Sequence, residues 1–143
     1  MDATSKLKRA WMPLWAAIAL HVADEAVHDL LGVYNPTVRA MRAVVPWLPL
    51  PSFTFRVWIA GLIAGIALGF IATPLIPRLR LAAYAVAILM TGNGLMHALG
   101  TILGHTVPSV QFPRPMPGFD SSPVLIAASI WMLVQLRRCS FTR

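Results

Sequence analysis

The chain has 143 residues, of which 57% are hydrophobic and 12% are charged, and its formal net charge is +7. Soluble domains carry about 25% charged residues, so this composition excludes an ordinary soluble domain and indicates a small integral membrane protein with a single domain, residues 1–143. The Lys and Arg residues flank apolar runs and are not interleaved with aromatic residues, which favours membrane lipids over nucleic acid as their partner. The single cysteine, Cys139, excludes an internal disulfide.

Four apolar runs predict an all-α fold, because each comes close to the roughly 20 residues that a membrane-spanning helix needs. We expect a bundle of four transmembrane helices, with a short amphipathic helix in the interface after the first span. Eight basic residues lie at the termini and in the turn between the second and third runs, and four lie in the other two loops. This asymmetry predicts a multi-pass protein of the inner (cytoplasmic) membrane with both termini in the cytoplasm. The predicted spans are residues 11–31, 55–75, 81–101 and 119–136.

The first run contains a polar stripe. His21, Asp24, Glu25 and His28 follow the spacing i, i+3, i+4 and i+7. A helix turns about 100° per residue, so these four residues share one face. Ionisable groups inside a span are costly and by default indicate a functional site. The stripe is therefore the first candidate for the chemistry of this protein.

The segment after the first run predicts the interfacial helix. Residues 36–45 place Arg39 and Arg42 on one face and apolar residues elsewhere, and Asn35-Pro36 is a favourable helix start. The prolines and Trp47 of residues 46–54 then predict an extended segment.

Glycines recur at every fourth position of the second run, at Gly61, Gly65 and Gly69. Such a ladder forms a flat groove that a second helix backbone can approach closely. Packing within the bundle and a homodimer seam both fit this pattern.

The third run carries Asn93 and His97, four residues apart and so on one face. At a rise of about 1.5 Å per residue, Asn93 lies roughly 3 Å and His97 roughly 9 Å outward of the middle of its span. Glu25 lies roughly 6 Å outward of the middle of the first span by the same measure. Polar groups at matched depth predict that the two helices face each other, and Thr101 continues the same face.

The loop from Gly104 to Ser122 is rich in proline, which forbids regular structure, and we expect it to fold as a rigid lid. Four residues complete the predicted site as contacts for a substrate: His28, Thr101, Trp58 and Trp131. For the two tryptophans, packing or a place in the aromatic belt of the membrane is the alternative.

Three short motifs resemble those of the small bacterial membrane proteins named for their HXXEE motif. His21-Val-Ala-Asp24-Glu25 is similar to the first motif, Asn93-Gly-Leu-Met-His97 to the second, and Met116-Pro117-Gly118 to the third. Asp24 stands where the family has Glu, which keeps the charge, and Arg114-Pro115-Met116 replaces the aromatic residue of the third motif. The resemblance covers nearly the whole chain and implies a fold and a site without implying a reaction.

A looser similarity connects the His21-x-x-x-Glu25 spacing and the order of spans and loops to the eukaryotic sterol isomerases of the emopamil-binding family. That similarity implies a His and a Glu that move protons on a lipid-like substrate through a carbocation. It is an analogy of layout, and layout does not determine function.

These features predict a membrane-embedded acid/base enzyme that acts on an apolar terpenoid, sterol-like or lipid-like substrate by isomerisation, cyclisation or hydration. We expect Glu25 and His21 to be the proton-transfer pair and Asp24 to orient them or stabilise a cation. His97 and Asn93 would complete the pocket, and no cofactor is expected.

Two alternatives fit the same residues. A metal-dependent membrane enzyme could hold zinc or iron through His21, Glu25, His28 and His97, since imidazoles and carboxylates at these spacings can chelate both metals. A non-enzymatic lipid-binding or pH-sensing membrane protein would use its histidines as switches.

Overall fold

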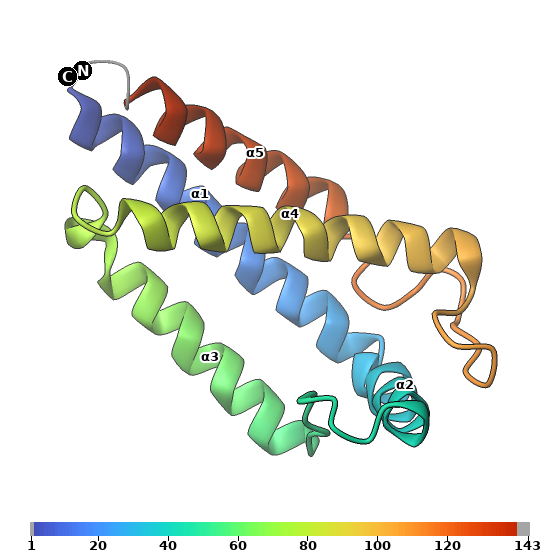
Figure 1. Cartoon of the computed structure of the whole chain (residues 1–143). Helices are drawn as coiled ribbons and strands as arrows, with labels where there is room; N and C mark the ends of the chain where they lie inside the picture. Colours follow the sequence, from blue (N-terminus) through green and yellow to red (C-terminus); the bar gives the residue numbers. More distant parts are fainter. Residues whose placement is uncertain (1, 140–143) are drawn as a thin grey trace.

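The computed structural model describes residues 2–139. Within this range the chain forms helices and no strand, which confirms the predicted all-α class. In Figure 1, α1, α3 and α5 slope the same way across the view, α4 crosses in front of α1, and α2 is seen nearly along its own axis at one end. The elements are α1 (Ala3–Val27), α2 (Leu30–Val44), α3 (Phe55–Ile71), the 3₁₀ helix η1 (Thr73–Leu75), α4 (Arg80–Leu103) and α5 (Ser122–Arg138).

The core lies between α1, α4 and α5. The helix α5 packs against both α4 and α1, and α3 packs against α1. Leu14 of α1, Ala87 of α4 and Met132 of α5 are fully buried there. At the end of the bundle where α5 finishes, Arg80 donates hydrogen bonds to the carbonyl oxygens of Leu136 (2.9 Å) and Cys139 (3.3 Å). A basic side chain satisfies the last carbonyls of a helix in this way and fixes the relative height of α4 and α5.

The first helix ends earlier than its apolar run. Asp29 adopts a left-handed backbone conformation (φ 54°). This conformation separates α1, which ends at Val27, from α2, which begins at Leu30. The Asp29 carboxylate then accepts a hydrogen bond from the Gly32 N–H (3.2 Å) and caps α2. The helix that we expected in the membrane interface therefore begins at Leu30, before the predicted start at Pro36, and Pro36 lies inside it.

The extended segment after α2 is fastened back onto that helix. The Asn35 side chain donates to the Phe53 carbonyl (2.9 Å) and accepts from the Phe53 N–H (3.0 Å). The Tyr34 hydroxyl donates to the Pro51 carbonyl (3.0 Å). These bonds hold the segment before α3 against α2.

The four-span prediction is not confirmed by length and composition. Among the described residues, α4 is the one helix long and apolar enough to cross a membrane by these two criteria. The helix α3 is apolar but has 17 residues. The helix α1 carries charged residues at both ends, and α5 ends in Arg137 and Arg138, so neither reaches the same mean hydropathy.

The three glycines of α3 have different environments. A Cβ atom at Gly69 would collide with the Trp15 indole, so this glycine allows α1 and α3 to approach closely. The Trp11 indole N–H donates to the Gly69 carbonyl (2.8 Å) in the same contact. A Cβ atom at Gly61 or Gly65 would meet nothing within 4 Å. Gly69 thus packs within the bundle, and the homodimer seam stays a prediction.

Candidate functional site

A buried carboxylate lies between two buried imidazoles. Glu25 Oε1 is 3.3 Å from His21 Nε2 and 3.1 Å from His97 Nε2. The three residues are 5%, 3% and 4% exposed, respectively. The two imidazole rings meet edge to face, with centroids 4.8 Å apart. Since His97 belongs to α4 and the other two belong to α1, the structure brings together the helices that the matched depths predicted to face each other.

Asn93 completes this cluster from α4. Its Oδ1 lies 2.6 Å from His21 Nε2, so that ring nitrogen faces two oxygens. An amide side chain offers both an acceptor and donors, and a half-turn of the amide exchanges them. Asn93 can therefore bind His21 Nε2 whether or not that nitrogen carries a proton.

Ser121, just before α5, is a site residue that the sequence did not reveal. Its Oγ lies 2.8 Å from His21 Nδ1 and donates to Asp24 Oδ2 (2.6 Å). Its backbone N–H donates to the same carboxylate oxygen (2.9 Å). The only signal in the sequence is that serine before a proline near the first helical turn is typical of a helix start. That signal predicts a cap and gives no hint of partners about a hundred residues away.

Asp24 points away from the cluster centre. Its Oδ2 accepts from Ser121, and its Oδ1 is 2.7 Å from His28 Nδ1. Asp24 is therefore connected to His21 through Ser121, and among the described residues it forms no hydrogen bond or ion pair with Glu25 or His97. The expectation that Asp24 orients the proton-transfer pair or stabilises a cation stays a prediction, and the structure shows the contacts through which it would act on His21.

The loop between α4 and α5 lies against the two imidazoles. Gly118 has a φ of 89°, and a Cβ atom there would lie 2.7 Å from His97 Cε1 and 3.0 Å from His21 Cε1. Thr101 holds the loop, since its Oγ1 accepts from the Met116 N–H (3.0 Å) and donates to the His97 carbonyl (2.9 Å). The loop therefore covers one side of the cluster, and Thr101 positions that loop.

A cavity of about 410 Å³ opens beside the cluster. Glu25, Asn93 and His97 supply its polar groups from α1 and α4. Its other lining residues are aromatic or aliphatic and come from α2, the segment before α3, α3 and the loop. Its size lies within the range of small-molecule sites. These other lining residues are Leu30, Tyr34, Phe53, Trp58, Leu62 and Met116.

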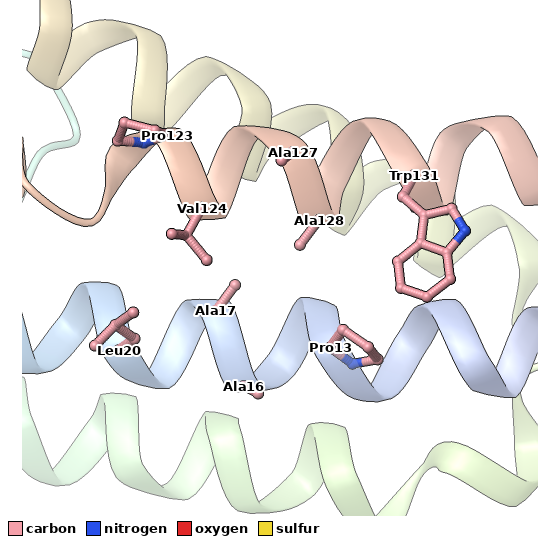
Figure 2. Close-up of a pocket in the computed structure, with 9 residues that line it drawn as sticks. All are labelled: Pro13, Ala16, Ala17, Leu20, Pro123, Val124, Ala127, Ala128 and Trp131. Atoms are coloured by element: carbon pink, nitrogen blue, oxygen red, sulfur yellow. The ribbon is translucent and has the colours of Figure 1, made fainter.

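Three of the four predicted substrate contacts do not line this cavity, and Thr101, which holds the loop, is one of them. The His28 side chain is 52% exposed and bonds to Asp24 on the outer side of the cluster. Trp131 lines a separate apolar groove of about 620 Å³ between α1 and α5, where Figure 2 shows it across from Pro13. Of the predicted substrate contacts, Trp58 alone lines the cavity beside Glu25.

The cluster could hold a metal ion through His21 Nε2, Glu25 Oε1 and His97 Nε2, which lie within 4.8 Å of one another. A metal-binding histidine almost always donates its second ring N–H to a partner. His21 Nδ1 has such a partner in Ser121, whereas the buried His97 Nδ1 has none among the described residues. His28 does not join this group and instead lies with Asp24 and Asp120 in a more exposed one. The donor set therefore fits a metal only in part.

Comparison with protein-family models, curated proteins and solved structures found no match to this chain.

Proposed function

We propose that this protein is a membrane-embedded acid/base enzyme acting on an apolar terpenoid, sterol-like or lipid-like molecule. The observation that carries the proposal is the buried Glu25 carboxylate, held between two imidazoles where it borders a cavity. A carboxylic acid and an imidazole beside it can donate a proton to a substrate and take one back. Isomerisation, cyclisation and hydration of a carbon–carbon double bond all need those two steps.

The lining of the cavity supports an apolar substrate. Tyr34, Phe53 and Trp58 present aromatic rings, and the rings of Tyr34 and Phe53 stack with centroids 5.9 Å apart. The Tyr34 hydroxyl already donates its O–H to a backbone carbonyl, so it has no proton left to donate to a polar substrate group. Aromatic faces also attract cations, which suits a substrate that becomes positively charged when protonated.

The outer surface of the bundle supports a place in the membrane. Large apolar side chains on α3 and α4 are exposed, among them Leu68 (65%), Leu81 (85%) and Leu89 (64%). Only 22% of the 18-residue apolar stretch of α4 is buried inside the protein, whereas the core helix of a soluble domain is mostly buried. We infer that α1, α3, α4 and α5 cross the bilayer together and enclose the polar cluster, and that the substrate enters from the lipid.

A metal-dependent enzyme is the second candidate, because three ligating atoms lie within 4.8 Å of one another. We place it behind the first, since His97 Nδ1 has no hydrogen-bond partner among the described residues and Asn93 Oδ1 already lies 2.6 Å from His21 Nε2. A lipid-binding protein without turnover would use the same cavity.

The proposed orientation, with both termini cytoplasmic in the inner membrane, predicts which end of the bundle is accessible from outside the cell. Cys139 is 7% exposed and therefore a poor reporter, so it is replaced by Ser. In that background, a membrane-impermeant thiol reagent added to intact cells is expected to label Trp47→Cys, a position 81% exposed beyond α2. The exposed Ala3→Cys, at the start of α1, is expected to react only after lysis. The reverse pattern of labelling would overturn the orientation.

The cavity predicts that an apolar molecule co-purifies with the protein. Mass spectrometry of lipids extracted from the detergent-purified wild-type protein is expected to detect this molecule. Leu62→Trp fills the cavity and should reduce its amount about tenfold, the effect of losing roughly 1.4 kcal/mol of binding. Leu68→Trp on the exposed face of α3 is the matched control and should retain the molecule. Equal amounts in both variants would show that this cavity is not the binding site.

A further inference from the structure

A chain of polar side chains connects the buried cluster to the surface, with an ion-pair contact as its first link and hydrogen bonds as the others. It starts at Glu25, whose Oε1 lies 3.3 Å from His21 Nε2. From His21 Nδ1 it continues to Ser121 Oγ (2.8 Å) and from there to Asp24 Oδ2 (2.6 Å). Asp24 Oδ1 then meets His28 Nδ1 at 2.7 Å. The chain thus passes through both oxygens of Asp24 and both nitrogens of His21.

Exposure to water rises toward one end of this chain. Glu25 and Ser121 are both 5% exposed as whole residues. The Asp24 side chain is 9% exposed, and the His28 side chain is 52% exposed. The chain therefore connects a buried carboxylate to an imidazole that is in contact with the solvent or the membrane interface.

We propose that Ser121, Asp24 and His28 form the path by which the buried Glu25–His21 pair exchanges protons with the surface. This inference rests on the proposed function, because a path of this kind serves a carboxylate that must be reloaded after it gives up or takes a proton. It assigns roles to Asp24 and His28 outside the substrate cavity, and it adds Ser121 to the working residues of the site.

Each step of the path moves one proton between side chains that are in contact. Outward, Glu25 gives its proton to His21 Nε2 while His21 Nδ1–H passes its own to Ser121 Oγ. The Ser121 hydroxyl proton moves to Asp24, and after the carboxyl group turns, Asp24 delivers a proton to His28 Nδ1. His28 releases a proton to water from Nε2, so one proton leaves Glu25 and one reaches the solvent. The reverse sequence reloads Glu25.

Ser121 is the residue that distinguishes a proton path from a structural clamp. A clamp needs only that Ser121 and Asp24 hold the start of α5 against α1, and the Ser121 backbone N–H, which also donates to Asp24 Oδ2 (2.9 Å), would do part of that. A path needs the hydroxyl, because a hydroxyl oxygen accepts one proton while giving up another. Removing the hydroxyl therefore breaks a path and leaves part of a clamp in place.

The test follows proton exchange directly and needs no substrate. Full-length protein with 15N-labelled histidine is prepared in lipid nanodiscs, and NMR measures the rate at which the His21 Nδ1–H exchanges with water. His21→Gln identifies the signal. Ser121→Ala is expected to slow this exchange about 10²-fold, the lower end of what a positioned proton-transfer group contributes. Ser121→Thr keeps the hydroxyl and should restore it.

The matched control is the neighbouring serine. Ser122 is as deeply buried (2% exposed), but its hydroxyl donates to the Gly118 carbonyl (2.6 Å) and not to Asp24. Ser122→Ala should therefore leave the exchange rate of His21 unchanged. Unchanged or faster exchange in Ser121→Ala would overturn the path and leave Ser121 as a clamp.

The outer end provides a second variant that does not threaten folding. His28→Ala changes an exposed side chain and is expected to slow the exchange of His21, and added imidazole is expected to restore the rate. His105→Ala, at another exposed histidine, should have no effect. If His28→Ala leaves the exchange rate of the His21 Nδ1–H unchanged, His28 is not part of the path. Because these rates are measured without turnover, the path can fail while the acid/base role of Glu25 holds, and the reverse.

Discussion

Glu25→Gln is expected to fold, to retain the molecule bound in the cavity and to lose about 10²- to 10⁴-fold in turnover, the usual contribution of a general acid or base. The amide keeps the size and much of the hydrogen bonding of the carboxylate, but it has no proton to exchange at neutral pH. In the structure the change occurs between His21 Nε2 and His97 Nε2, at 3.3 and 3.1 Å. The measurement is the rate of product formation with the substrate identified from the co-purifying molecule.

Asp2→Asn is the matched control for this charge change. Asp2 is an exposed N-cap whose carboxylate accepts from the Ser5 N–H (3.0 Å), and asparagine caps helices about as well as aspartate. Turnover should be unaffected in that variant. Full turnover in Glu25→Gln would contradict the assignment of Glu25 as a general acid or base.

Glu25→Gln also distinguishes the acid/base function from the competing ones. If the cluster holds zinc or iron, the purified wild-type protein should contain the metal in stoichiometric amount, and Glu25→Gln should contain less. If the cluster is only structural, Glu25→Gln should change the free energy of unfolding little or increase it. The carboxylate is 5% exposed, and the cost of removing its charge from water disappears in the variant. In a shared proton-transfer unit, adding His21→Gln to Glu25→Gln should cost little beyond either single change.

The pairing of α1 with α4 at the site could be predicted because the position of a residue along a helix axis follows from its sequence number. His21 and Glu25, and likewise Asn93 and His97, are four residues apart and so share a face. The constant rise per residue then places Asn93 and His97 at the level of the first pair. The 2.6 Å contact of Asn93 with His21 and the 3.1 Å contact of His97 with Glu25 follow from this regularity.

Residues outside regular helices could not be placed in this way. Ser121 and Gly118 lie in a loop whose path depends on tertiary contacts, such as the hydrogen bond from the Met116 N–H to Thr101. The end of α1 was also missed, because the apolar run continues to Leu31 while the left-handed conformation of Asp29 interrupts the helix. Trp131 lies away from the cluster because the rotation of α5 about its axis is set by packing of Leu125 and Met132, which are fully buried.

The loop residue with the most severe steric constraint is Gly118, and Gly118→Ala is expected to lower the free energy of unfolding by about 2–5 kcal/mol. About 1–2 kcal/mol comes from a left-handed backbone conformation in a residue with a Cβ atom, and about 1–3 kcal/mol from overpacking. The added atom would lie 2.7 Å from His97 Cε1 and 2.8 Å from His97 Nδ1, and 3.0 Å from His21 Cε1. Both rings must therefore move, and the distances that hold Glu25 between them cannot be kept.

Gly92→Ala separates this collision from the general effect of adding a methyl group. Gly92 lies inside α4, where a Cβ atom would meet nothing within 4 Å, and alanine favours a helix over glycine by about 1 kcal/mol. Denaturant unfolding in the same detergent should therefore show Gly92→Ala at least as stable as wild type and Gly118→Ala clearly less stable. In Gly118→Ala the 15N signals of His21 and His97 should shift together, since one atom displaces both rings. Equal stability of the two variants, with unshifted histidine signals, would mean that the loop does not lie against the imidazoles and that the cluster is open on that side.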